Sequence, residues 1–206
     1  MFLRKGFRPL LVAAAGLLWG GAHAFPNVGN QIADAVVSAL TPTGSAPSAG
    51  TVEYAFSPDA GAEKLVLKVI GTSKKQIRMM AYALTSAPVV SALIAAKKRG
   101  VDVAVVCDYK QNTSDSGGSR ARAALNALVN AGIPVRTVAA FAAHHDKILV
   151  SDQLTVQTGR FNYSAAAAKS NSENVIVLWG NEAVTTGYLR HWESRWQIGR
   201  DWRTGY

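Results

Sequence analysis

From residue 51 onward, short apolar runs rich in β-branched residues alternate with segments of helical periodicity, and this alternation constrains the fold more than any other feature. The apolar runs predict strands, and they lie at residues 52–56, 76–83, 101–107, 135–138 and 175–179. The periodic segments predict helices, and they lie at residues 61–70, 89–99, 120–130 and 182–196. Such alternation is typical of a sheet covered by helices. We therefore expect one α/β domain, a sandwich in which a mixed β-sheet is flanked by helices on both faces.

A further pair of strands is predicted on either side of a polar break, which favours a hairpin. A two-residue turn at residues 152–153 would place Lys147 opposite Thr158. The same turn would place His145 opposite Arg160. His145 and Lys147 are two residues apart, so they share one face of their strand.

This hairpin gathers an imidazole, an ammonium group and, just past the second strand, the carboxamide of Asn162. Such a set can bind a phosphate and attack it. A short match of His and Lys is more often just a solvated strand end. The longer pattern H-x-K-x4-D-x6-G-x-x-N, from His145 through Asp152 and Gly159, is far more specific.

The pattern resembles the HKD motif of the phospholipase D superfamily, and within it the small, single-motif Nuc-type endonucleases of bacteria. The similarity extends to residues 77–82 and 171–174 and covers about residues 50–200. The resemblance implies that residues 51–206 form a phospholipase D-like catalytic domain. No internal repeat of the motif is present, unlike in the two-motif members of the family.

The resemblance also implies roles for four residues. His145 would be the nucleophile that takes the phosphoryl group, Lys147 and Asn162 would bind its non-bridging oxygens, and Glu173 would orient the histidine. Asp152 and Gly159 are further motif positions. Because the hairpin puts Asp152 at the far turn, we expect it to cap that turn or pair with a basic group, not to transfer protons.

Arg160 departs from the pattern, because the family usually has Ser at this position. A guanidinium group suits phosphate oxygens, so Arg160 could strengthen substrate binding. It could equally crowd the pocket and weaken turnover, and the sequence leaves both outcomes open.

The histidines suggest a shared site. Cleavage through a covalent phosphohistidine needs one imidazole to attack phosphorus and another to protonate the leaving oxygen. The chain has four histidines, His23, His144, His145 and His191, and only His145 has the H-x-K context. His144 should point to the opposite face of the strand. We therefore predict a symmetric homodimer in which two chains supply one site.

No metal or cofactor is expected for this reaction. The sequence has no H-E-x-x-H pattern and no Cys–His cluster, and the carboxylates near the motif are too few for a two-metal nuclease. The single cysteine, Cys107, ends an apolar run and is interpreted as a buried core thiol.

Residues 1–24 are predicted to be a secretory signal peptide: a basic start, an apolar run and the Ala-His-Ala cleavage site. The alternative is an uncleaved anchor, but the run is shorter than the ~20 residues that a membrane span requires. Residues 25–50 form an N-terminal segment and linker, which includes a short amphipathic helix or is loosely attached. We expect a periplasmic or extracellular protein with no stable membrane insertion after cleavage.

Cleavage would remove three cations and no acids, so the formal charge would fall from +9 to +6. This excess favours a polyanion such as nucleic acid or an anionic membrane. Residues 108–119 form a polar loop that could bind phosphate but is more often a surface loop. Residues 192–202 interleave Trp with Arg, which suits nucleic-acid contact or, as we favour, packing.

The leading hypothesis is an exported, metal-independent phosphodiesterase that hydrolyses DNA, and RNA as a further substrate, without sequence preference. One alternative keeps the chemistry but changes the substrate to a phospholipid such as cardiolipin. Another, which Arg160 allows, is a nucleic-acid-binding protein without catalysis.

Overall fold

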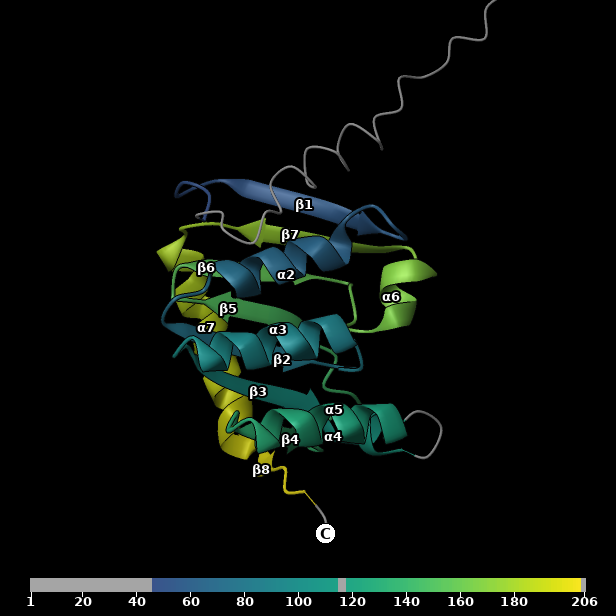
Figure 1. Cartoon of the computed structure of the whole chain (residues 1–206). Helices are drawn as coiled ribbons and strands as arrows, with labels where there is room; N and C mark the ends of the chain where they lie inside the picture. The colour runs from purple at the N-terminus through teal and green to yellow at the C-terminus, as the bar shows by residue number, and fades with distance from the viewer. Residues whose placement is uncertain (1–45, 115–117, 205–206) are drawn as a thin grey trace, which may run out of the picture.

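The computed structural model describes residues 46–114 and 118–204 (Figure 1). The predicted signal peptide, residues 1–24, and all but the end of the predicted segment 25–50 lie outside these residues. Within them, no helix is long and apolar enough to cross a membrane.

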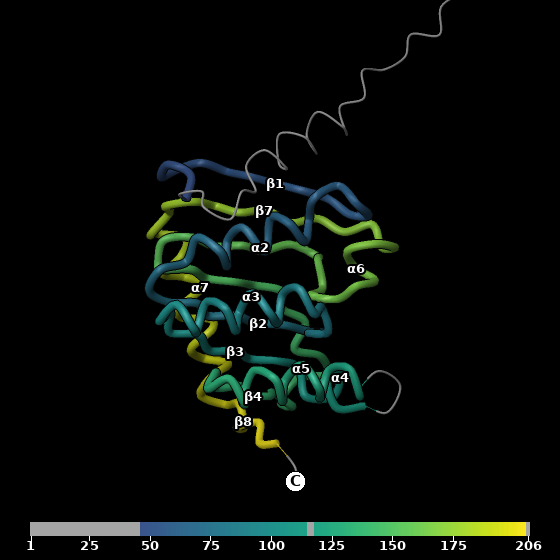
Figure 2. The backbone as a smooth tube through the Cα atoms, viewed as in Figure 1, coloured from purple at the N-terminus to yellow at the C-terminus, as the bar shows by residue number. Residues whose placement is uncertain are grey.

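The described residues form one mixed sheet of eight strands in the order β1-β7-β6-β5-β2-β3-β4-β8. The strands are β1 (Val52–Ser57), β2 (Gln76–Ala81), β3 (Asp102–Asp108), β4 (Val135–Val138), β5 (Lys147–Ser151), β6 (Thr155–Gly159), β7 (Glu173–Leu178) and β8 (Arg200–Asp201). Strands β2, β3 and β4 are parallel, and the other neighbours are antiparallel. Figure 2 shows β1 at one edge of the sheet and β8 at the other.

Helices cover both faces, as the alternation predicts. They are α2 (Ala62–Thr72), α3 (Ala87–Lys98), α4 (Tyr109–Thr113), α5 (Gly118–Asn130), α6 (Ala165–Lys169) and α7 (Glu182–Ile198). Figure 1 shows α2, α3 and α5 on one face and α7 crossing behind the other. The predicted fold class, a single α/β domain with a mixed sheet between helices, is confirmed.

Three short elements escaped prediction: α4, α6 and β8. The helices α4 and α6 each have five residues and begin at a side-chain cap, Asp108 and Ser164, whose oxygens accept backbone N–H bonds. A helix of this length is too short to show an apolar periodicity in the sequence, and only its N-cap residue indicates where it begins.

The core has two layers because the central strands β2, β3 and β5 are buried on both faces. Leu149 joins the larger cluster under α2, α3 and α5, whereas its neighbours Ile148 and Val150 join the cluster under α7. Cys107 is fully buried in the larger cluster, and burial raises the pKa of its thiol. The side chains of this strand therefore alternate between the two faces of the sheet, as its sequence predicts.

The C-terminal tryptophans pack within the domain. Trp192 is buried beneath the sheet, donates its indole N–H to the Met79 carbonyl at 3.0 Å and stacks on Trp196. The Arg136 guanidinium lies 4.4 Å from the centre of the Trp196 ring, and the Trp202 indole donates to Asn126 at 2.8 Å. In the described structure these tryptophans therefore serve packing, the role predicted for residues 192–202.

The predicted hairpin forms, but its predicted register is wrong by one residue. Leu149 pairs with Gln157 and Ser151 with Thr155, so the turn contains three residues, 152–154. Lys147 therefore does not face Thr158, and His145 lies before β5 instead of opposite Arg160. The cause is a tertiary contact: Asp152 donates its backbone N–H to the Gln76 carbonyl at 2.9 Å, which ties the turn to the start of β2.

Candidate active site

His145 lies in the loop before β5, and buried hydrogen bonds fix the backbone of this loop. The Asp108 carboxylate, at the end of β3, accepts the N–H of His144 at 2.7 Å and the N–H of Gln111 at 2.6 Å. The Tyr82 N–H, just after β2, donates to the Asp146 carbonyl at 2.9 Å. The ends of two neighbouring parallel strands therefore hold the loop, while the His145 side chain is exposed.

Lys147 and His145 are in direct contact. Lys147 is only 4% exposed. Its Nζ lies 2.8 Å from Nδ1 and 3.2 Å from Nε2 of His145, and it donates a hydrogen bond to the His145 carbonyl at 2.8 Å. A neutral imidazole has one lone pair, so only one ring nitrogen can accept from the ammonium at a time. The Tyr82 ring packs against both groups, 4.3 Å from the centre of the imidazole and 5.0 Å from Nζ.

The charges in this cluster lower two pKa values. Partial burial lowers the pKa of His145, and the cations of Lys147 and Arg160 lower it further, against the opposing charges of Asp108 and Asp146. Burial, aided by Arg160, lowers the pKa of Lys147 to about 8. His145 is therefore neutral at a lower pH than a free imidazole, while Lys147 is still mainly an ammonium group at neutral pH.

Arg160 is placed by the motif glycine before it. Gly159 has a φ of 138°, and a Cβ there would overlap the backbone oxygen of Asn174, so glycine is required. The Arg160 N–H donates to the same oxygen at 3.0 Å, and the side chain is exposed. Within the described part of the chain, the guanidinium group has no hydrogen bond or ion pair.

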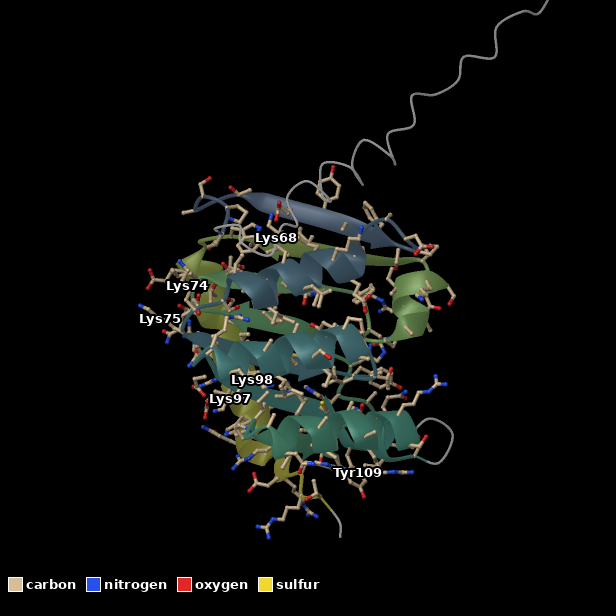
Figure 3. All side chains as sticks on the ribbon, in the orientation of Figure 1. Lys68, Lys74, Lys75, Lys97, Lys98 and Tyr109 are labelled. Atoms are coloured by element: carbon tan, nitrogen blue, oxygen red, sulfur yellow. The ribbon has the colours of Figure 1, made fainter. Side chains whose placement is uncertain are left out.

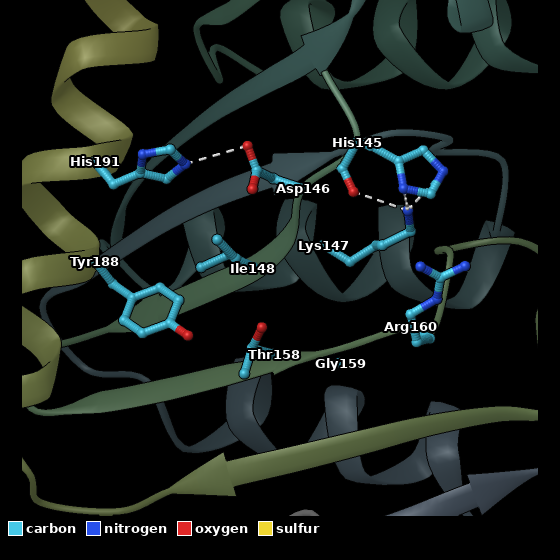
Figure 4. Close-up of a pocket in the computed structure, with 9 residues that line it drawn as sticks. All are labelled: His145, Asp146, Lys147, Ile148, Thr158, Gly159, Arg160, Tyr188 and His191. Atoms are coloured by element: carbon cyan, nitrogen blue, oxygen red, sulfur yellow. Dashed lines mark hydrogen bonds and ion pairs between the residues drawn. The ribbon is translucent and has the colours of Figure 1, made fainter. Parts of the chain in front are cut away.

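These groups line a pocket of about 310 Å³ that Figure 4 shows in close-up. His145, Lys147 and Arg160 form one wall, and His191 with Asp146 forms the other. The two walls differ in electrostatic character: the cations of Lys147 and Arg160 stand together on one, whereas the other carries the Asp146 carboxylate beside His191. A phosphate would therefore be attracted to the His145 side.

Asp146 lies close to two further histidines. Its Oδ2 lies 3.2 Å from Nε2 of His191 and 3.3 Å from Nδ1 of His144. His144 is buried, and this burial lowers its pKa. His144 thus lies on the side of the loop away from solvent, whereas His145 is exposed, so the two adjacent rings have different surroundings.

Two predicted site residues do not line this pocket. Glu173, at the start of β7, lines a neighbouring pocket, and its Oε1 accepts from the Asn171 side chain at 3.0 Å. Its charge acts on Lys147, whose pKa it raises against the other effects. Asn162 lines neither pocket, and its buried Oδ1 has no hydrogen-bond partner. The structure thus brings together His145, Lys147 and Arg160 and leaves the roles of Asn162 and Glu173 as predictions.

Asp152 lies at the opposite end of β5 from Lys147. Its carboxylate accepts the backbone N–H groups of Lys74 at 2.9 Å, Lys75 at 2.7 Å and Gln76 at 2.9 Å. These contacts join the β5–β6 turn to the segment that connects α2 and β2.

Three residues that support the site, Tyr82, Asp108 and Asn112, were given no individual role from the sequence. Asn112 is fully buried; it donates to the carbonyls of Tyr82 and Asp108 at 2.7 Å each and accepts from the Leu84 N–H at 3.2 Å. The position of Asp108 directly after a buried strand was the available indication. Nothing local distinguishes Asn112 from a surface residue of the polar loop 108–119 to which it was assigned.

The positive charge of the protein is not concentrated at this pocket. Lys74 and Lys75 precede β2, and Lys97 and Lys98 end α3, so all four gather at the other end of the sheet (Figure 3). The net charge therefore says little about the site, and the two cations Lys147 and Arg160 beside His145 say more. Within residues 46–114 and 118–204, no cluster of three or more His, Cys, Asp or Glu side chains could hold a metal ion.

Known proteins resemble this chain in sequence and in fold. The family model described as cardiolipin synthase, PLD-like domain, matches residues 66–196. Phospholipase D from Rickettsia bellii is 35% identical over 151 residues, which cover 72% of this chain and 70% of that protein. Mitochondrial cardiolipin hydrolase from Danio rerio is 30% identical and covers 63% of this chain and 56% of that protein.

Two solved structures share this fold. Nuc from Salmonella typhimurium, described as a phospholipase D family member, superimposes with a TM-score of 0.71 at 44% identity and covers 75% of this chain and 99% of that one. NucT from Helicobacter pylori gives a TM-score of 0.60 at 12% identity over 74% of this chain and 100% of that one, which shows the shared fold alone.

Proposed function

Because the chain belongs to the phospholipase D superfamily, as a phosphodiesterase-type hydrolase, we propose that it hydrolyses DNA, and also RNA, without sequence preference or a metal ion. One observation carries the proposal: an exposed imidazole with a lowered pKa lies beside Lys147 and Arg160 in a single pocket. A nucleophile and two cations for the phosphoryl oxygens are thereby supplied by the chain itself.

The reaction proceeds in two displacements. In the first, an imidazole nitrogen of His145 attacks phosphorus, a P–N bond forms, and the P–O bond to the leaving group breaks as a second imidazole donates a proton to that oxygen. In the second, water attacks phosphorus, the P–N bond breaks, and the second imidazole takes a proton from the water. Lys147 and Arg160 stabilise the charge on the phosphoryl oxygens in both steps.

The second imidazole, in this proposal, is His145 of the partner subunit, so the active form is a homodimer. His191 of the same chain also lines the pocket, but its Nε2 is engaged with Asp146 on the other wall. Two variants separate these assignments. His145→Ala should abolish turnover. When wild-type chains are refolded with an excess of His145→Ala chains, activity should fall further than dilution predicts, because mixed dimers carry only one His145. His191→Gln should remain active, and an active monomer in light scattering would contradict the shared site.

A phospholipid substrate is the second candidate, since relatives are named phospholipase D and mitochondrial cardiolipin hydrolase. The pocket favours nucleic acid, because it presents mainly charged and polar groups and only Ile148 as an aliphatic side chain. The third candidate function is binding of nucleic acid without catalysis. It would apply if Arg160 blocks the attack by His145.

One experiment distinguishes the three. The purified protein is incubated in EDTA with plasmid DNA and, separately, with cardiolipin liposomes. Nicking that is absent from His145→Ala supports the proposal, and lipid turnover without nicking would replace it by the second candidate. Retention of DNA without nicking would favour the third, and inhibition by EDTA would refute the metal-independent mechanism.

We also propose that residues 1–24 direct export and are then removed, and that residues 25–50 join the exported chain to the catalytic domain. N-terminal sequencing of protein expressed in a Gram-negative host would test this. A periplasmic or extracellular product starting at Phe25 is expected, and a product that retains Met1 would contradict the proposal.

A further inference from the structure

A second pocket of about 600 Å³ adjoins the first and shares Arg160 with it. Phe56 from β1 forms one side, and Asn171, Ser172, Glu173 and Asn174, at and before the start of β7, form the other. Because the Arg160 backbone is bonded to Asn174, the side chain that lines both pockets is held at their boundary. A substrate that continues from the first pocket would pass Arg160 into the second.

The aromatic side of this pocket is unusually exposed. Phe56 is 49% exposed, and Tyr54, two residues earlier on the same face of β1, is 51% exposed. The two rings lie edge to face with their centres 5.8 Å apart. Exposed aromatic side chains next to a basic groove are what proteins use to stack the bases of single-stranded nucleic acid.

The remaining side of the pocket is polar. Five of the six lining residues are polar or charged, which gives an acyl chain no apolar channel. The Asn171 amide and the Glu173 carboxylate already bond to each other at 3.0 Å and present donors and acceptors suited to the edge of a base. Because Glu173 repels phosphate, the backbone phosphate is best placed at Arg160 and the base deeper in the pocket.

From these contacts we propose that the second pocket binds an unpaired base next to the scissile phosphate, with Phe56 as its stacking surface and Arg160 on the phosphate that joins the two pockets. The inference rests on the proposed nuclease function and narrows its substrate. A base that stacks on Phe56 cannot also stack in a duplex. Unpairing and unstacking a duplex base costs a few kcal/mol, whereas an unpaired base avoids most of this cost. The chain therefore prefers single-stranded substrates.

The test compares oligothymidylate with an oligomer of equal length whose sugars carry no bases, and with a duplex of thymidylate and adenylate. The wild-type protein should cleave oligothymidylate fastest. Stacking of ~1–3 kcal/mol per base predicts that Phe56→Leu lowers kcat/KM for oligothymidylate by roughly 5- to 150-fold. The same variant should leave cleavage of the base-free oligomer unchanged.

Val52→Leu is the matched control, because Val52 is 53% exposed on the same face of β1 but does not line the pocket. It should behave as wild type on all three substrates. Arg160→Ser should make the salt dependence of kcat/KM shallower for both single-stranded oligomers, by about 0.7 in the log–log slope, because one phosphate contact is lost.

The outcomes separate this inference from the function on which it rests. Cleavage of all three substrates at equal rates, unchanged by Phe56→Leu, would refute the base pocket and leave the nuclease intact. Cleavage of none of them would refute both. A loss on the base-free oligomer as large as that on oligothymidylate would show that Phe56 supports the fold of the site and does not bind a base.

Discussion

Replacing Asp152 should destabilise the protein without disabling its chemistry. The carboxylate accepts three backbone N–H groups, of which those of Lys74 and Lys75 are exposed and that of Gln76 is partly buried. Water can replace the carboxylate at the exposed groups, so they contribute ~0.5 kcal/mol each, whereas a partly buried bond to a charged group contributes ~1.5–3 kcal/mol.

The backbone adds a further cost for one substitution. Asp152 has a φ of 53°, a conformation that Asp and Asn tolerate better than Ala does, by about 1 kcal/mol. We therefore expect Asp152→Ala to lower the free energy of unfolding by about 3.5–5 kcal/mol. Asp152→Asn, which keeps one acceptor oxygen and tolerates this φ, should lower it by about 1–2 kcal/mol.

Catalysis should change little because β5 separates Asp152 from Lys147. The five residues of β5 span roughly 16 Å, about two Debye lengths at physiological ionic strength. Urea denaturation and kcat of the folded enzyme should be measured together, at a temperature where Asp152→Asn is fully folded. A kcat that falls more than tenfold in Asp152→Asn while the unfolding midpoint is unchanged would refute the structural assignment.

Further predictions concern pH and packing. Arg160→Ser removes a cation that lowers the pKa values of His145 and Lys147, so both should rise. One His145 imidazole must be neutral to attack phosphorus, and the partner's His145 must be protonated to donate to the leaving oxygen, so both limbs of the pH profile of kcat/KM should move to higher pH. A shift to lower pH would contradict this electrostatic account. Trp192→Phe removes the donor to the Met79 carbonyl and part of a buried ring, so urea denaturation should show a loss of ~1–3 kcal/mol with activity retained. Asp108→Ala leaves the N–H groups of His144 and Gln111 without their acceptor, so kcat should fall even though Asp108 does not line the pocket, and an unchanged kcat would show that the loop is fixed by other contacts.

The sequence predicted the sheet well because its central strands β2, β3 and β5 are buried on both faces and appear as continuous apolar runs. It failed on the register of the β5–β6 hairpin for a physical reason. Local pattern favours a two-residue turn at residues 152–153, but the bonds from Asp152 to residues 74–76 hold the turn to another strand. A contact across so many residues leaves no trace in the local pattern.

The site residues differ in the same respect, because some can be placed from sequence spacing and others only from the tertiary structure. His145 and Lys147 are close in sequence, so their spacing was enough to place them together. The positions of Asn162 and Glu173 depend on how the chain leaves β6 and enters β7, which spacing does not specify. Tyr82 and Asp108 reach His145 only because β2 and β3 are parallel neighbours that end at the same edge of the sheet.

Lys147 links substrate binding to the release of the nucleophile. Its ammonium group lies within hydrogen-bond distance of both ring nitrogens of His145, and the lone pair that accepts this bond is the one that must attack phosphorus. A phosphate oxygen is a stronger partner for an ammonium group than a neutral imidazole is. Binding of substrate would therefore draw Lys147 away from the ring and free the attacking nitrogen at the moment when a phosphorus atom is in reach. In Lys147→Met, the lone pair of His145 is free before substrate binds, but the ammonium group that binds the phosphate is missing. KM should therefore rise and kcat should fall together. If only KM changed in steady-state kinetics, Lys147 would be a binding residue alone and this coupling would be wrong.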